Sequence, residues 1–489
     1  MKNIKYILLL LCLWVFTTTN ILAKGIESST LHFNKNGTFK IVQFTDIHWE
    51  TGMPANPITI LTMENILDRE KPDLVVLTGD IVTSKDPQKG WEEVAAPLIN
   101  RKIRWVATLG NHDSEGDTPR NVIHKIIQSL PYNLNQSALN TSGQGNFSVP
   151  VLASDNKTNG AILYFFDSHA YASPYLPGGY DWIKIDQIEW YKNQSNHYRS
   201  ENQNYPIPSY AFFHIPLCEY KFVKDDANTV GNIGEEVSSP EINTGLFAGM
   251  VEQRDVIGVF TGHDHNNDFI GTYKDIALAY GRCSGTYAYG KLRRGARVVQ
   301  INENEFHFNS WISTPRGKSA EFIYPSTKNK FSLNEAPLPS VKLDKDKLTQ
   351  GLNYSYYEGE INSVDEISNL PEIKTGTTTN FSLTQANAKD HFAFIFEGYL
   401  KISSTDCYQF YLLSDDGSKI YIDDQLIVDN DGGHSIKLKK GLVNLEEGFH
   451  KIRLTYFEDY MGNELEVGIS SLKMRDGILP DNLLFILKK

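Results

Sequence analysis

Between residues 40 and 270, short apolar runs alternate with helix-like stretches such as 58–69 and 122–130. Each apolar run is rich in β-branched or aromatic residues and ends at turn-forming residues, a pattern typical of buried strands. The alternation of strands and helices predicts an α/β domain. The expected strands span residues 40–45, 73–78, 105–109, 210–213 and 256–261.

The second half of the chain has a different pattern. From Gly351 onward, several segments alternate apolar and polar residues with a period of two, and turns rich in Asp and Gly separate them. Many short strands with regular turns indicate an all-β sandwich or barrel. Residues 316–348 are polar, hold several Pro residues and show little periodicity, which predicts a linker. We therefore expect one domain at 24–315 and a second at 349–489.

The N-terminus has the pattern of a secretory signal peptide. Lys2 and Lys5 precede an apolar run at residues 7–16, and polar residues then lead to Ala23. This pattern predicts a signal peptide at residues 1–23. The apolar run is shorter than the roughly 20 residues of a membrane span, although an uncleaved N-terminal anchor is the alternative. We expect a secreted, periplasmic or cell-surface protein with no transmembrane helix in the mature chain.

Composition narrows the function classes. Hydrophobic residues make up 40% of the chain and charged residues 22%, which allows sizeable cores. The 47 basic and 59 acidic residues give a net charge of −12. We expect no stable nucleic-acid complex, because such binding depends largely on neutralising phosphates. Cys218, Cys283 and Cys407 follow the signal peptide, so at least one thiol stays free or pairs between chains, and a Cys218–Cys283 disulfide is left open.

Residue types that commonly bind metal ions, namely Asp, His and Asn, follow each of the five expected strands. In α/β sheets, functional groups gather at the carboxyl ends of strands. Two metal ions a few ångströms apart can clamp a phosphoryl group and activate a water, if one carboxylate bridges them. Mixed nitrogen and oxygen ligands suit Mn, Fe, Zn or Co. The candidate ligands are Asp46, His48, Asp80, Asn111, His214, His263 and His265.

The order of these motifs, D-x-H, G-D, G-N-H-[DE], H and G-H-x-H, resembles the calcineurin-like metallophosphoesterase superfamily over residues 38–312. The resemblance implies a four-layer αββα fold and two divalent or trivalent transition-metal ions. It implies that Asp80 bridges the two ions. By the same match, one ion is held by Asp46, His48, Asp80 and His265, and the other by Asp80, Asn111, His214 and His263.

The resemblance also implies roles around the metals. His112 would stabilise the transition state or protonate the leaving group while a metal-bound hydroxide attacks phosphorus. Asp113 would orient His112, as a carboxylate does for an imidazole. Arg282 and Tyr287 are candidate substrate contacts, and His169, after another strand-like run, could touch substrate at the rim.

A branch of the superfamily is also indicated. The stretch GHDHNNDFIG and the segments after it look like the purple-acid-phosphatase-like branch. Purple enzymes carry D-x-G and G-D-x-x-Y, where the Tyr binds iron and gives the colour. Here His48 stands in the Gly position and Thr83 in the Tyr position. The Tyr ligand is therefore lost and a His ligand is gained. Because the Tyr gives the colour, the sequence predicts a colourless enzyme.

Residues 349–475 resemble a PA14 domain. The match includes Gly351-Leu-x-Tyr-x-Tyr-Tyr-Glu358-Gly and Ser414-Asp-Asp-Gly-Ser418. PA14 domains are often carbohydrate-binding modules, and in adhesin-like members paired Asp residues hold a calcium ion that contacts sugar. Asp415 and Asp416 match that pair, with a plain turn as the alternative. The resemblance therefore implies a glycan as a partner.

Together these features predict an exported, metal-dependent phosphoric ester hydrolase, with phosphomonoesters favoured over diesters. Two alternatives stay open. One is a phosphodiesterase or nucleotide hydrolase, because many diesterases carry the Asp found at position 113, where phosphatases more often have Glu. The acidic net charge argues against long polyanionic substrates. The other is a surface glycan-binding protein with an inert phosphoesterase domain.

Overall fold

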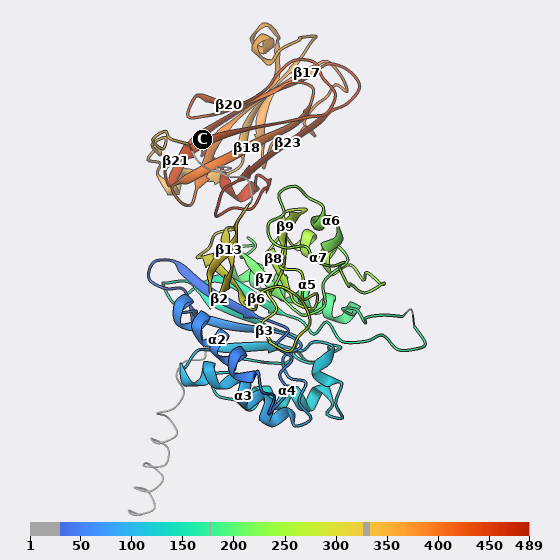
Figure 1. Cartoon of the computed structure of the whole chain (residues 1–489). Coiled ribbons are helices and arrows are strands. Elements are labelled where there is room, and N and C mark those ends of the chain that lie inside the picture. The colour runs from blue at the N-terminus through green and yellow to red at the C-terminus, as the bar shows by residue number, and fades with distance from the viewer. Residues whose placement is uncertain (1–29, 177, 326–332, 489) are drawn as a thin grey trace, which may run out of the picture. The chain divides into compact units, whose positions relative to one another are not determined.

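The computed structural model describes residues 30–176, 178–325 and 333–488 (Figure 1). The predicted signal peptide, residues 1–23, lies outside these ranges. The chain divides into two compact units, and the second consists mainly of the residues from Tyr324 onward. In the part of the chain that the structure describes, no helix is both long and apolar enough to span a membrane.

The first unit contains a six-stranded sheet in the order β13-β12-β11-β2-β3-β4. Strands β2, β3 and β4 are parallel, while β11 runs antiparallel to both β2 and β12. Both faces of β3 and β4 are buried, which explains their continuous apolar sequences. The strands are β2 (Thr38–Phe44), β3 (Leu74–Thr78), β4 (Trp105–Thr108), β11 (Ala296–Asn302), β12 (Phe308–Thr314) and β13 (Gly317–Tyr324).

A seven-stranded sheet, in the order β1-β5-β6-β7-β8-β10-β9, forms the other half of this unit. Tyr210 on β7 and Phe260 on β8 contact Phe308 on β12, so the two sheets pack face to face. The strands of this sheet are β1 (Leu31–His32), β5 (Phe147–Leu152), β6 (Asn159–Phe165), β7 (Ser209–Phe212), β8 (Val256–Thr261), β9 (Ile270–Tyr273) and β10 (Ile276–Tyr280).

Helices complete the four layers. Met63 of α2, Trp91 of α3 and Ile123 of α4 share one core with the six-stranded sheet, and Tyr191 of α5 and Met250 of α7 share another with the seven-stranded sheet (Figure 1). This is the predicted αββα arrangement. The helices are α2 (Asn56–Glu70), α3 (Pro87–Asn100), α4 (Arg120–Ser129), α5 (Ile185–Glu201), α6 (Tyr220–Lys224) and α7 (Leu246–Gln253).

The register of the parallel strands decides where their ends lie. Phe44 pairs with Leu77 and Leu77 pairs with Ala107, so β2, β3 and β4 end at one edge of their sheet. In the other sheet, Phe212 pairs with Phe260 near the ends of β7 and β8. The segments that follow these strands can therefore meet at one edge of the domain.

The predicted linker at 316–348 begins later than expected, because Gly317–Tyr324 forms β13 at the edge of the six-stranded sheet. Most of its side chains are exposed or half-buried. An edge strand with so little burial has a polar sequence, which sequence patterns do not separate from a linker. Near the C-terminal end of the predicted linker, Leu338 forms a β-bridge with Leu445, and Val341 forms one with Phe449. These two residues therefore belong to the second unit.

The second unit is all-β, as predicted. An eight-stranded sheet and a four-stranded sheet enclose one core to which Phe394 and Phe410 contribute from opposite sheets. Its strands are β14 (Leu348–Gln350), β15 (Leu352–Glu358), β16 (Glu372–Thr378), β17 (Phe392–Ile402), β18 (Asp406–Asp415), β19 (Ser418–Ile422), β20 (Gln425–Asn430), β21 (Lys437–Leu445), β22 (Gly448–Glu458), β23 (Glu464–Ser470), β24 (Gly477–Ile478) and β25 (Leu484–Leu487).

Candidate metal centre

The seven predicted ligands all leave the carboxyl ends of strands in the first unit. Tight turns aim several of them into the site, since Asp46, His48, Asp80 and His263 have φ values of 51°, 47°, 52° and 84°. Residues other than Gly seldom adopt this left-handed region, and such positions cluster at functional sites. Gly79 makes room for them, because a Cβ atom there would lie 2.6 Å from the His214 ring.

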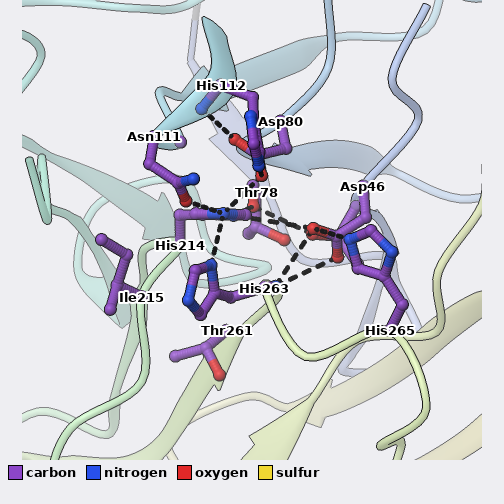
Figure 2. A network of polar contacts seen from close by, with 12 residues as sticks. Asp46, Thr78, Asp80, Asn111, His112, His214, Ile215, Thr261, His263 and His265 are labelled. Atoms are coloured by element: carbon purple, nitrogen blue, oxygen red, sulfur yellow. Dashed lines mark hydrogen bonds and ion pairs between the residues drawn. The ribbon is translucent and has the colours of Figure 1, made fainter. Parts of the chain in front are cut away.

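The structure brings six of the seven side chains together in two groups, and Figure 2 labels the members of these groups except His48. In the first group, His265 Nε2 lies 3.3 Å from Asp46 Oδ1, and His48 is the third member. In the second group, His214 Nε2 lies 3.1 Å from Asp80 Oδ2, and His263 is the third member. Within each group, the possible ligand atoms all lie within 4.8 Å of one another.

Asp80 lies near both groups, and Asn111 lies beside the second group. Asp80 Oδ2 lies 3.1 Å from His214 in its own group and 3.7 Å from His48 Nε2 in the other. Asn111 Oδ1 lies 3.2 Å from His214 Nε2. The carboxylate predicted as the bridge therefore stands between the two groups, and Asn111 lies on the side to which the motif assigns it.

Backbone carbonyl groups fix which nitrogen of two histidines faces the site. His214 Nδ1 lies 2.8 Å from the Thr78 carbonyl oxygen, and His265 Nδ1 lies 3.1 Å from that of Tyr289. A carbonyl oxygen only accepts hydrogen bonds, so each Nδ1 carries the proton and donates it. Each Nε2 therefore faces the carboxylates, where it would present its lone pair to a bound metal ion. Without an ion, burial opposes protonation of both rings, but Asp80 outweighs it and raises the pKa of His214 to about 9, and Asp46 raises the pKa of His265.

The electrostatics of the cluster fit a cation. Burial lowers the pKa of His48 to about 4, and burial together with the charge of His214 lowers that of His263 to about 3, so both rings are neutral. His48 Nε2 is buried and has no hydrogen-bond partner among the residues that the structure describes. His263 Nδ1 lies only 3.3 Å from His214 Nε2. Facing nitrogens and buried carboxylates form a donor set for transition metals.

Asp113 does not make its predicted contact with His112. Its carboxylate oxygens accept hydrogen bonds of 2.7–2.9 Å from the backbone N–H groups of four residues in the β3 and β4 turns. The carboxylate is therefore committed to holding these turns. Glu115 takes the predicted role instead, because its Oε2 lies 2.7 Å from His112 Nδ1. The His112 backbone N–H donates to Asp80 Oδ1 at 2.8 Å.

A network that sequence analysis missed links His112 to Asn111. The Tyr171 hydroxyl donates to Glu115 Oε1 at 2.9 Å and accepts from Asn111 Nδ2 at 3.1 Å. Glu115 thus contacts His112 with one oxygen and Tyr171 with the other, and the Asn111 amide is turned so that Oδ1 faces His214. The spacing of Glu115, three residues after His112 in a short helical turn, could have suggested its contact.

Two further aromatic residues border the ligands. The Tyr180 ring lies 4.4 Å from that of His263 between centroids, and the Tyr289 ring stacks on His265 at 3.9 Å. Tyr171 and Tyr180 also bridge to each other in the segment after β6. These tyrosines come from loops, where no periodic pattern marks a residue for a site.

The three predicted substrate contacts lie in different settings. Arg282 is only 5% exposed, forms an ion pair with Asp268 and donates to the Arg293 carbonyl group, so both recorded contacts hold it within the protein, and its role as a substrate contact stays a prediction. The Tyr287 hydroxyl accepts from the Ala55 backbone N–H at 2.7 Å. His169 Nε2 lies 2.8 Å from Gln187 Oε1. Neither of these recorded contacts reaches a predicted metal ligand.

The cysteines of the described chain are all free. Cys218 and Cys283 therefore do not form the disulfide that the sequence left open. The Cys218 thiol donates to the Pro240 carbonyl group, and the Cys283 thiol donates to that of Asp46. Burial raises the pKa of Cys283, which keeps its thiol protonated and unreactive.

The second unit holds a separate acidic cluster of Asp415, Asp416 and Glu458, whose oxygens lie within 4.8 Å of one another. Asp416 accepts from the backbone N–H groups of His434 and Asp459, at 2.7 and 2.9 Å. Burial, with the charges of the two aspartates, raises the pKa of Glu458 to about 7. The predicted Asp pair thus has a third carboxyl neighbour.

Comparisons with known proteins agree with this geometry. Residues 39–267 match the calcineurin-like phosphoesterase family, and residues 348–479 match the PA14 domain. A relative from Arabidopsis thaliana named "Probable inactive purple acid phosphatase 29" is 37% identical over 316 residues, which cover 58% of this chain and 81% of the relative. The chain belongs to the calcineurin-like phosphoesterase family and carries a PA14 domain.

Two other relatives also match the first half of the chain. "Probable inactive purple acid phosphatase 14" from Arabidopsis thaliana is 32% identical over 346 residues, covering 62% of this chain and 84% of that protein. "Phosphatase DCR2" from Saccharomyces cerevisiae is 34% identical over 314 residues, covering 56% of this chain and 53% of that protein. The names of the two relatives from Arabidopsis thaliana support the resemblance to the purple-acid-phosphatase-like branch.

Proposed function

We propose that this protein is an exported phosphoester hydrolase that uses two transition-metal ions, Mn, Fe or Zn, and prefers monoesters. The observation that carries the proposal is the pair of ligand groups with Asp80 between them. Asp80 Oδ2 lies within 3.7 Å of a histidine nitrogen from each group. A shared carboxylate between two such groups is what a dinuclear phosphoryl-transfer site requires.

Residues of the chain would divide the work around the ions. Asp46, His48, Asp80 and His265 would hold one ion, and Asp80, Asn111, His214 and His263 the other. When bound, the ions supply Lewis-acid stabilisation of phosphoryl oxygens and a nucleophilic water.

His112 would protonate the departing oxygen. Its Nδ1 is held by Glu115 at 2.7 Å, and its Nε2 lies 4.0 Å from Asp80 Oδ2, on the side of the ligand cluster. A protonated ring fixed through Nδ1 can donate from Nε2 to a leaving alcohol. Glu115 would hold the ring in this orientation and Tyr171 would hold Glu115.

Three relatives carry the word "inactive" in their names, and this raises the alternative of an inert domain. All seven predicted ligands and His112 are present in this chain, and their geometry supports activity. Asp113, which left a diesterase open, contacts only backbone N–H groups in its recorded hydrogen bonds. These contacts do not separate monoester from diester preference, so the phosphodiesterase stays the alternative.

The deciding experiment measures initial hydrolysis rates of the full chain on p-nitrophenyl phosphate and bis-p-nitrophenyl phosphate, with added Mn²⁺ and with chelator. Asp80→Ala is the control that should remove activity. A chelator-sensitive preference for the monoester would support the proposal. A preference for the diester would replace it with a phosphodiesterase, and no turnover with metal bound would favour the inert domain.

We further propose that the N-terminal segment exports the chain and that the PA14 domain binds a glycan with a calcium ion held by Asp415 and Asp416. The support is the N-terminal sequence pattern, the PA14 match and the cluster with Glu458. Calcium prefers several carboxylate oxygens. Calcium titration followed by calorimetry should show a site that Asp416→Asn removes and Asp424→Asn, in a separate turn, retains.

A further inference from the structure

A cavity of about 200 Å³ lies beside His112. Residues of the loop between β3 and α3 line one side, and residues of the turn after β4 line the other. In the described chain its lining includes none of the seven predicted metal ligands. An apolar cavity of about 150 Å³ holds a benzene molecule, so this space is large enough for a small organic group. The lining includes Thr83, Lys85, His112, Glu115 and Thr118.

The position of His112 connects this cavity to the metal centre. The His112 ring lines the cavity, while its Nε2 lies 4.0 Å from Asp80 Oδ2. In the proposed function, the leaving oxygen of a phosphoester lies next to His112. The rest of the leaving group would then extend past the ring toward the cavity, which the metal ligands leave free.

The charges that line the cavity are nearly all engaged. Glu115 contacts His112 with one oxygen and accepts from Tyr171 with the other. Asp113 accepts from four backbone N–H groups. Lys85 is exposed, and within residues 30–176, 178–325 and 333–488 it forms no ion pair. Among the lining residues, Lys85 is therefore the basic side chain that no carboxylate of the described chain holds.

Hydroxyl groups add polar partners. Among the described residues, the recorded partner of Thr83 Oγ1 is the Trp49 carbonyl group, at a long 3.4 Å. Thr118 is half-buried, and no hydrogen bond of its side chain is recorded within the described ranges. A polar lining with one unpaired cation is suited to a hydroxylated, anionic group rather than to an apolar one.

We propose that this cavity is the leaving-group subsite and that Lys85 selects phosphoesters whose alcohol carries a carboxylate. The inference rests on the proposed function for the placement of the phosphoryl group. It names a substrate class, phosphorylated hydroxy acids, and it assigns specificity to a residue that touches neither metal group.

Binding tests this without turnover. Phosphonoalkanoates with two to four methylene groups, each compared with the alkylphosphonate of equal length, are titrated calorimetrically into the Mn²⁺-loaded full chain. We expect at least one carboxylate compound to bind about 3- to 10-fold more tightly than its partner, the range of a partly exposed ion pair. Lys85→Met should remove the difference, and Lys89→Met, four residues away and outside the cavity, should retain it.

Kinetics separates this inference from the proposed function. The full chain should show a lower KM for 3-phosphoglycerate than for glycerol 3-phosphate, Lys85→Met should equalise the two KM values, and Lys89→Met should keep the difference. Hydrolysis of p-nitrophenyl phosphate with no carboxylate preference in either assay would overturn the inference and leave the hydrolase intact. Carboxylate-selective binding without any hydrolysis would support the subsite and contradict the hydrolase.

A second variant tests the cavity itself. Thr118→Trp fills the space from a half-buried position, so we expect it to weaken the longest phosphonoalkanoate more than inorganic phosphate. Equal binding of both ligands to this variant and to the unmodified chain would show that the leaving group lies elsewhere. Circular dichroism of Lys85→Met and Thr118→Trp checks that each variant keeps the fold.

Discussion

Replacing Glu115 tests the network around His112 most directly. Glu115→Ala removes the carboxylate that lies 2.7 Å from His112 Nδ1 and accepts from Tyr171 at 2.9 Å. The His112 ring would then lose the partner that fixes its orientation. We expect the largest effect on substrates whose leaving group needs a proton, because His112 is the proposed donor.

The structure sets the size of this effect. A hydrogen bond to a charged group contributes about 1.5–3 kcal/mol when shielded. The side chains of His112 and Glu115 are 36% and 48% exposed, so solvent reduces the value to about 1–1.5 kcal/mol. If that energy is lost only in the transition state, the rate falls about 5- to 12-fold.

The assay compares kcat/KM on phenyl phosphate, a poor leaving group, with that on p-nitrophenyl phosphate, which leaves readily without a proton. Glu115→Ala should slow the first by the full factor and the second by much less, and Glu115→Gln should recover part of the loss. Asp117→Ala, an exposed acidic residue in the same loop, is the matched control. Equal losses on both substrates, or the same loss in the control, would refute the reasoning.

Three further outcomes are expected. Asp80→Asn should lower both the metal content, measured by plasma emission spectrometry, and hydrolysis, since Asp80 lies within 3.7 Å of both histidine groups. The metal-loaded protein should show no visible tyrosinate–iron band, because Thr83 stands where purple enzymes have Tyr; a coloured protein would contradict this. Burial opposes the protonation of His450, but Asp423 at 2.6 Å outweighs it and raises the His450 pKa. The stabilisation is therefore complete below about pH 6.5 and is lost as pH rises through the raised pKa. Unfolding temperatures of the full chain between about pH 6 and 9 should fall less in His450→Asn, and an unchanged slope would exclude this pair as the cause.

The arrangement of the candidate ligands could be anticipated because each follows a strand within a few residues. Asp46, Asp80 and Asn111 follow three parallel strands that end at one edge of a sheet, and His214 and His263 follow two more. Buried strands have a strong apolar pattern, and parallel pairing brings their carboxyl ends together. Local pattern and general topology were therefore enough to indicate a cluster.

The edge strand β13 shows where pattern fails. Gly317–Tyr324 pairs with β12, yet most of its residues are exposed or half-buried. Its pairing depends on backbone hydrogen bonds, which any sequence without Pro can make, and not on side-chain burial. A polar edge strand and a linker therefore have similar sequences.

The amino-acid sequence by itself determined the five strands that precede the candidate ligands, the change from an α/β to an all-β pattern and the identities of the seven candidate ligands, because these depend on short-range patterns. Only the tertiary structure decided which carboxylate contacts His112, that Arg282 is buried against Asp268, and that Tyr171 reaches Asn111 from 60 residues away. These contacts depend on how loops pack over the strand ends. Loop conformation is set by contacts between distant segments, which leave no periodic signal in the sequence.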